Sequence, residues 1–191
     1  MYQKYSTDVL VLGSRELGES DRTYMLYTHD FGLVRARASA VRAEKSKMRY
    51  ALQNYSRANV SLIKGKRGWR LAGARAGHGF TASSDVRGVS AFARVSELVM
   101  RLVQGEGENT YLFATLTEAH EAFLRGGEAV PTIEIMCVAR VLFALGYISA
   151  EALQTAIFSH TDYALEHVHE AEGLKDKLLS SINRAISETH L

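Results

Sequence analysis

The sequence predicts an α+β protein of two domains, a small closed β-barrel over residues 1–80 and an all-α helical domain over residues 81–191. Three observations support this prediction. Five short β-favouring runs fall within the first 80 residues, helical apolar spacing begins near residue 85, and the sign of the charge changes between the two parts. A chain of 191 residues is long enough for two small domains.

The β-favouring runs are short and are separated by turn residues. They cover residues 7–12, 22–28, 33–38, 59–63 and 69–74. The sequence Asp30-Phe31-Gly32 predicts a tight turn that joins the second and third runs as a hairpin. Five short strands in so few residues are typical of a small barrel, and the SH3-like and OB folds both fit this pattern.

From residue 85 onward the apolar residues follow the i, i+3, i+4 spacing of helices, after a linker over residues 81–85. Helices are predicted near residues 89–103, 112–123, 133–145, 149–158 and 174–187, with a polar stretch before the last. Gly126 and Gly127 end the second of these helices, and Pro131 suits the first turn of the third. The third is apolar on nearly all sides, which predicts the buried central helix of a bundle.

The charge is distributed unevenly along the chain. The first 75 residues hold 15 basic and 6 acidic residues, a net charge of +9, whereas the other 116 hold 8 basic and 15 acidic residues, a net charge of −7. A basic domain of this size is typical of a polyanion binder, and nucleic acid is the commonest such partner.

The basic residues of the barrel gather on one strand and the loop after it. Side chains alternate along a strand, so Val34, Ala36 and Ala38 are predicted to face inward while Arg35 and Arg37 face outward. Such a face, continuous with a basic loop, can bind a phosphate backbone. The predicted nucleic-acid-binding residues are Arg15, Arg22, Arg35, Arg37, Arg42, Lys45, Lys47 and Arg49. Aromatic residues that could stack on unpaired bases are Tyr24, Tyr27, Tyr50, Tyr55 and Trp69, and the alternative is that they pack the core, as Tyr and Trp in strands usually do.

Signatures of catalysis are scarce. No GxSxG, HExxH or CxxC motif occurs, and Glu19 stands where a phosphate-binding loop requires lysine. The single cysteine, Cys137, lies in the most apolar predicted helix and is interpreted as an inert core thiol. His160, His167 and His169 are the densest group of candidate metal ligands, and they are interpreted as part of a solvated acidic loop. We therefore expect no enzyme activity, no cofactor and no metal.

Several motifs together resemble the N-terminal domain of the RecO family of bacterial recombination mediators. They are residues 11–21 with the sequence VLGSRELGESD, residues 28–34 with the sequence THDFGLV, and Ala51-Leu52-Gln53 followed by Tyr55. Ser96-Glu97-Leu98 and Leu145-Gly146-Tyr147 are similar to landmarks of the helical domain of the family. The resemblance is strongest over residues 8–56.

The resemblance implies an OB-fold followed by a helical domain, and a protein without enzymatic turnover. Family members bind single- and double-stranded DNA, anneal complementary strands, engage single-strand-binding protein and, with RecR, help to load RecA. The basic loop of the family maps onto residues 42–49, and its basic hairpin strand maps onto Arg35 and Arg37.

Three departures from the family pattern are visible. Ser39-Ala40 replaces the usual Lys-Gly at the start of the basic loop, and Asn54-Tyr55 replaces the usual Pro-Phe after Leu52-Gln53. Many members carry a four-cysteine zinc module after the Leu-Gly-Tyr landmark. This chain has no cysteine there, so it is expected to be a short form without zinc.

The leading hypothesis from the sequence is a non-catalytic DNA-binding mediator that anneals strands without ATP, with the helical domain as a docking surface for partner proteins. An RNA- or ribosome-associated OB-fold module is the alternative, and an enzyme with a histidine-bound metal is the third hypothesis. No signal peptide or run of about 18 apolar residues is recognised, so we expect a cytoplasmic, nucleoid-associated protein that binds no membrane.

Overall fold

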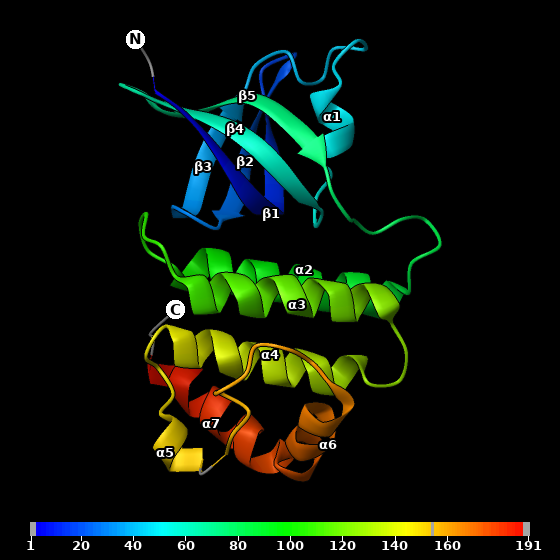
Figure 1. The fold of residues 1–191 in the computed structure, drawn as a ribbon, viewed down its shortest axis with the longest axis vertical. Coiled ribbons are helices and arrows are strands. Elements are labelled where there is room, and N and C mark those ends of the chain that lie inside the picture. Colours follow the sequence, from blue (N-terminus) through cyan, green and yellow to red (C-terminus); the bar gives the residue numbers. More distant parts are fainter. Residues whose placement is uncertain (1–2, 154, 189–191) are drawn as a thin grey trace. The chain divides into compact units, whose positions relative to one another are not determined.

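The computed structural model describes residues 3–153 and 155–188, which divide into two compact units (Figure 1). The barrel unit extends to Thr81 and also contains Gln104–Asn109. The helical unit contains Ala82–Val103 and the chain from Thr110 onward. Residues 104–109 therefore belong to the barrel unit, although they lie within the stretch predicted as helical.

The barrel unit is a closed barrel of five strands, as the sequence predicts. The strands are β1 (Lys4–Leu17), β2 (Asp21–Thr28), β3 (Gly32–Ala38), β4 (Arg57–Gly65) and β5 (Gly68–Ala76). They pair in the order β1-β2-β3-β5-β4, and β5 lies parallel to β3 while the other pairs are antiparallel. This is the OB-fold, one of the two barrels that the strand pattern left open.

The register of the barrel confirms the predicted alternation in β3. The hairpin of β2 and β3 pairs Thr28 with Gly32 at its turn and Arg22 with Ala38 at its open end. Val34, Ala36 and Ala38 are fully buried in the barrel core, whereas Arg35 and Arg37 are exposed. The strand thus contributes one face to the core and leaves both arginines to solvent.

Gly32 allows residues 104–109 to reach the barrel. It forms an isolated β-bridge with Glu106, and the Gly107 N–H donates to the Phe31 carbonyl over 3.1 Å. Gly32 has a φ of +63°, and a Cβ on it would lie 2.1 Å from the carbonyl oxygen of Gly107. Glycine is therefore required here for the backbone conformation and for the close approach of the loop.

Replacing Gly32 with alanine should lower the free energy of unfolding of the barrel unit by about 2–3 kcal/mol, because a left-handed conformation and a backbone clash are combined. Gly18→Ala is the matched control, since Gly18 has the same φ of +63° but no atom within 4 Å of the added Cβ. It should lose about 1 kcal/mol. Urea titrations followed by the fluorescence of Trp69, the single tryptophan, measure both variants. Equal losses of unfolding free energy in the two variants would show that the contact between Gly32 and the loop at Gly107 does not stabilise the barrel unit.

The helical unit is built around α4, which packs against α2, α3, α6 and α7. Its helices are α2 (Val86–Leu102), α3 (Thr110–Arg125), α4 (Val130–Ala144), α5 (Ala150–Leu153), α6 (Leu165–Gly173) and α7 (Lys175–Glu188). The Asp85 carboxylate caps α2 by accepting from the Arg87 N–H over 2.9 Å. Helices α2, α3, α4 and α7 confirm the prediction, including the central position of α4.

Three local predictions are wrong. The predicted polar stretch contains α6, which has only Val168 and Ala171 buried and so lacks a strong apolar repeat. The helix predicted over residues 149–158 is observed only as α5, Ala150–Leu153, and residue 154 lies outside the described residues. Residues 155–158 are not helical, and the Thr155 hydroxyl donates to the Glu170 carboxylate. The basic loop ends in a one-turn helix, α1 (Met48–Ala51).

Candidate nucleic-acid interface

A row of outward-facing residues crosses four strands of the barrel. Arg15 on β1 is paired with Thr23 on β2, Thr23 with Arg37 on β3, and Arg37 with Arg70 on β5. Directly paired residues share a face of the sheet, so the three arginines of this row point outward together with Arg35. Arg22 is on the opposite face of β2, beside the buried Tyr24. The register thus places Arg15, but not Arg22, with Arg35 and Arg37.

The parallel pairing of β3 with β5 brings the loop between β4 and β5 beside this row. The resulting surface, which we name the strand groove, is lined by Thr23, Arg35, Arg37, Ser39, Lys66, Arg67, Gly68, Trp69 and Arg70, with Glu106 at one end. Five of these residues are basic. The face of β2 and β3, together with the loops that follow β1 and β4, is the usual oligonucleotide-binding surface of an OB-fold.

The sequence prediction omitted Lys66, Arg67 and Arg70. The sequence carries a signal for them, because the turn Lys64-Gly65-Lys66-Arg67-Gly68 is as basic as the loop over residues 42–49. Only the pairing of β3 with β5 shows that this turn and Arg37 line the same groove.

The cations of the strand groove differ in how far they are neutralised. Within the described residues, Arg35, Arg67 and Arg70 form no ion pair. Arg37 is held by Asp21, whose Oδ2 accepts from the Arg37 Nε over 2.9 Å. The backbone N–H of Ala40 and, second, Arg37 lower the pKa of Asp21, which therefore stays ionised at neutral pH. A phosphate that binds Arg37 must compete with this carboxylate.

Asp21 also fixes the start of the basic loop. Its Oδ1 accepts from the Ala40 N–H over 2.8 Å, and Ala40 has a left-handed φ of +52°. A non-glycine residue adopts this conformation at a cost of roughly 1–2 kcal/mol. This is the position where the RecO-like pattern has glycine.

Glu106 places a negative charge at the edge of the strand groove. Its Oε1 accepts from the Trp69 Nε1–H over 2.7 Å, and its Oε2 accepts from the Lys64 Nζ over 2.8 Å. Lys64 also lies over the Trp69 ring, 5.0 Å from its centroid. The Lys64 ammonium is the largest influence that lowers the pKa of Glu106. The contact neutralises Lys64 and adds a carboxylate beside the arginines.

A second basic cluster, which we name the loop pocket, lies on the other side of β2. It is lined by Glu16, Arg22, Tyr24, Val41, Arg42, Arg49 and Gln53. Glu16 is the single acid among three arginines, 3.3 Å from Arg22 and 3.4 Å from Arg42. Lys45 and Lys47 are exposed on the loop between Arg42 and Arg49 and form no ion pair within the described part of the chain. The structure therefore divides the eight predicted residues. Two line the strand groove (Arg35 and Arg37), three line the loop pocket (Arg22, Arg42 and Arg49), Arg15 lies in the outward-facing row, and Lys45 and Lys47 lie on the loop.

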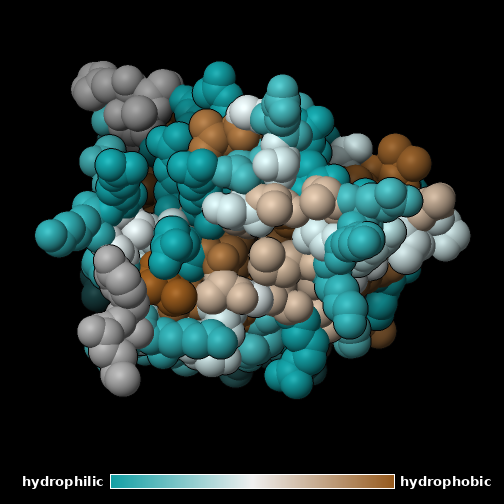
Figure 2. Space-filling view, turned by 90° about the horizontal axis from the view of Figure 1, so that it is seen from above, coloured by the Kyte–Doolittle hydropathy of each residue, from teal (hydrophilic) through white to brown (hydrophobic). Residues whose placement is uncertain are grey.

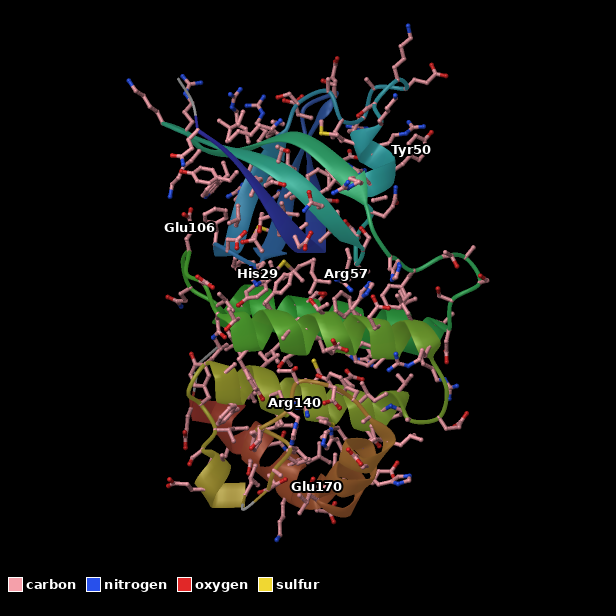
Figure 3. All side chains as sticks on the ribbon, viewed as in Figure 1. His29, Tyr50, Arg57, Glu106, Arg140 and Glu170 are labelled. Atoms are coloured by element: carbon pink, nitrogen blue, oxygen red, sulfur yellow. The ribbon has the colours of Figure 1, made fainter. Side chains whose placement is uncertain are left out.

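The aromatic residues are mostly unavailable for stacking. Tyr24, Tyr27 and Trp69 are buried, which fits core packing and leaves their rings unavailable to a base. The alternation that exposes the arginines turns Tyr24 and Trp69 into the barrel core. Tyr50 is 65% exposed on the outer side of α1 (Figure 3). The space-filling view onto this end of the barrel shows hydrophilic side chains around a less polar centre (Figure 2).

The histidines do not form a metal site in the part of the chain that the structure describes, where no group of three or more histidine, cysteine or acidic residues has the required geometry. The His167 Nδ1 lies 2.8 Å from the Asp162 Oδ1, and its ring stacks on that of His160 at 4.6 Å. Burial raises the pKa of the Cys137 thiol to about 12, which keeps it protonated and unreactive. No helix over the described ranges is long and apolar enough to cross a membrane.

Comparison with known proteins gives one consistent result. Residues 1–74 match the family described as "Recombination protein O N terminal". The chain is 44% identical over 62 residues to the DNA repair protein RecO of Desulfitobacterium hafniense, covering 32% of this chain and 23% of the relative. It is 33% identical over 132 residues to the DNA repair protein RecO of Myxococcus xanthus, covering 68% of this chain and 54% of the relative.

A third relative, the DNA repair protein RecO of Dehalococcoides mccartyi, is 30% identical over 118 residues and is covered over 47% of its length. The chain thus spans between about a quarter and about half of the length of these relatives. The similarity confirms the resemblance that the sequence motifs indicate, and the family match over residues 1–74 falls in the barrel that carries the strand groove and the loop pocket.

Proposed function

We propose that this chain, whose residues 1–74 match the N-terminal domain of the RecO family, is a non-catalytic DNA-binding mediator of recombinational repair. The observation that carries this proposal is the strand groove, where the fold gathers Arg35, Arg37, Lys66, Arg67 and Arg70 from two segments distant in sequence. A groove of this charge on the binding face of an OB-fold suits a nucleic-acid backbone.

The mechanism follows from electrostatics. Two complementary strands repel one another through their phosphates, and cations that neutralise some of these phosphates lower that repulsion. The strand groove and the loop pocket provide two cationic surfaces on one barrel, so one barrel can hold phosphates of both strands. Annealing by this route needs no nucleotide hydrolysis. Affinity depends on phosphates, and we expect weak dependence on base sequence.

Protein partners are part of the same proposal. The helical unit would dock RecR and single-strand-binding protein and so assist the loading of RecA indirectly. The net negative charge of the chain beyond residue 75 supports separate roles for the two units, because a negatively charged surface repels DNA and leaves the helices available to proteins. We propose that the chain acts on DNA at the nucleoid.

Fluorescence anisotropy with a labelled single strand across a salt series tests the proposal. Binding should weaken linearly with the logarithm of salt concentration, with a slope of about −0.7 for each phosphate neutralised. Annealing of complementary strands without ATP is the second readout, and an RNA of the same sequence tests the alternative of an RNA-binding module. No binding at low salt, or clear preference for RNA, would refute the proposal.

Glu106→Gln should raise the affinity for single-stranded DNA about three- to tenfold at low salt, because the change removes a negative charge and frees Lys64 for phosphate. The glutamine carbonyl can still accept from the Trp69 indole, so the fold should be retained. Glu108→Gln, on an exposed residue of the same loop, is the control and should change the affinity less than twofold. Equal effects of both changes would show that the contact with Lys64 is irrelevant and that only net charge matters.

A further inference from the structure

Tyr50 is the most exposed aromatic ring among the described residues of the barrel unit. Tyr50 is 65% exposed on the one-turn helix α1, whereas the other candidate stacking residues are buried or half-buried. An isolated exposed tyrosine is ordinary. The surroundings of Tyr50 are unusual, because the Arg49 guanidinium lies over one face of its ring and Arg49 also lines the loop pocket.

Arg49 holds the Tyr50 ring from one side. The Arg49 Cζ lies 4.8 Å from the ring centroid, and the Arg49 Nη2 donates to the Tyr50 hydroxyl over 2.8 Å. The Gln53 side chain donates to the Arg49 carbonyl over 2.7 Å and ties α1 together. These contacts orient the ring, so little conformational entropy remains to be lost when a flat ligand stacks on it.

Arg49 also lines the loop pocket. There it joins Arg22 and Arg42, with Glu16 as the single acid, so the pocket keeps an excess of two positive charges. The ion pairs of Glu16 are long and exposed, which makes them weak competitors for a phosphate. One residue, Arg49, therefore links an aromatic platform to a cationic pocket.

We propose that Tyr50 and the loop pocket form a subsite specific for single-stranded nucleic acid, in which an unpaired base stacks on Tyr50 and its backbone phosphate binds among Arg22, Arg42 and Arg49. The subsite rests on the proposed function, because it presupposes that the barrel binds DNA. A base within a duplex is stacked on its neighbours and its face is inaccessible, so the subsite discriminates between single and double strands. The strand groove binds phosphates, which single and double strands both carry, so it does not discriminate between them.

The test compares three probes with equal fluorescent labels: an intact single strand, a strand of the same length with abasic sites throughout its central part, and a duplex. A length of about 20 nucleotides exceeds the roughly 4–16 nucleotides that one OB-fold covers. The intact and abasic strands carry the same phosphates, so the ratio of their affinities measures contacts to bases. The proteins are the wild type, Tyr50→Ala, Tyr50→Phe and Tyr147→Ala.

Tyr50→Ala should bind the intact strand about 5- to 30-fold more weakly than the wild type does, with no change for the abasic strand or the duplex and an unchanged salt slope. Tyr50→Phe keeps the ring and should remain within about twofold of the wild type. Tyr147→Ala removes a tyrosine that is 41% exposed in the helical unit, and it should have no effect. These results together support the subsite.

Two outcomes overturn it. If Tyr50→Ala weakens the intact and abasic strands equally, Tyr50 acts only as a support for Arg49. If Tyr50→Ala changes nothing, the bases are bound elsewhere. In both cases the wild type still binds DNA with salt dependence, so the proposed function survives, whereas wild-type protein that binds none of the probes refutes the function itself.

Discussion

Replacing Arg35, Arg37 and Arg67 together by alanine is expected to weaken binding of single-stranded DNA about 100-fold at low salt. Each side chain lines the strand groove, and a contact to phosphate at an exposed site contributes roughly 1 kcal/mol. The slope of log affinity against log salt should become shallower by about 2, because about three phosphates lose their cation. Anisotropy titrations at four or more salt concentrations measure both quantities.

A charge-matched control separates the site from the net charge. Arg101, Arg125 and Arg184 are exposed arginines of the helical unit, and replacing all three by alanine removes the same charge from the chain. This variant should bind within about threefold of the wild type, with an unchanged salt slope. If both triple variants weaken binding equally, the charge of the whole chain governs binding, and the strand groove is not the site.

Replacing Arg140 by alanine should give the largest loss of stability, about 3–5 kcal/mol in the helical unit. Arg140 is fully buried in α4, and its guanidinium donates to the carbonyls of Ile157, Thr161 and Asp162 over 2.6–3.0 Å. It also lies over the Tyr163 ring at 4.8 Å. The variant would leave these acceptors without the guanidinium donor and open a cavity.

Two optical probes distinguish the units in this experiment. Helical circular dichroism follows mainly the helical unit, while the fluorescence of Trp69 follows the barrel unit. The helical transition should shift to lower urea concentration in Arg140→Ala, and the Trp69 transition should stay in place. Arg125→Ala, an exposed arginine at the end of α3, is the control and should change stability by less than 0.5 kcal/mol. An unchanged helical transition in Arg140→Ala would show that the carbonyls find other donors.

Arg140 also explains why apolar periodicity does not predict the conformation of this part of the chain. The segment between α5 and α6 has no strong apolar period, and its conformation depends on carbonyls that bind a side chain from α4. Helix α6 is held by Val168 and Ala171 alone on its buried face, which is too weak a pattern to be recognised without the neighbouring helix.

Local pattern alone determined most of the architecture of this protein. Strict alternation in residues 33–38 requires one face of the strand to be buried and places Arg35 and Arg37 outward, and the continuous apolar surface of α4 requires a central position. Both follow from the geometry of a strand or a helix and from the burial of apolar surface. The uneven charge and the motifs of the RecO family are equally properties of the chain itself.

The tertiary structure alone decided which residues share a surface. Parallel pairing of β3 with β5 joins the turn at Lys66 and Arg67 to Arg37, and the register of β2 separates Arg22 from Arg15. The return of Gln104–Asn109 to the barrel unit sets Glu106 beside these cations. Such juxtapositions join residues about 30 to about 80 positions apart in the chain, and they arise from strand pairing and loop docking, which short-range sequence periodicity does not encode.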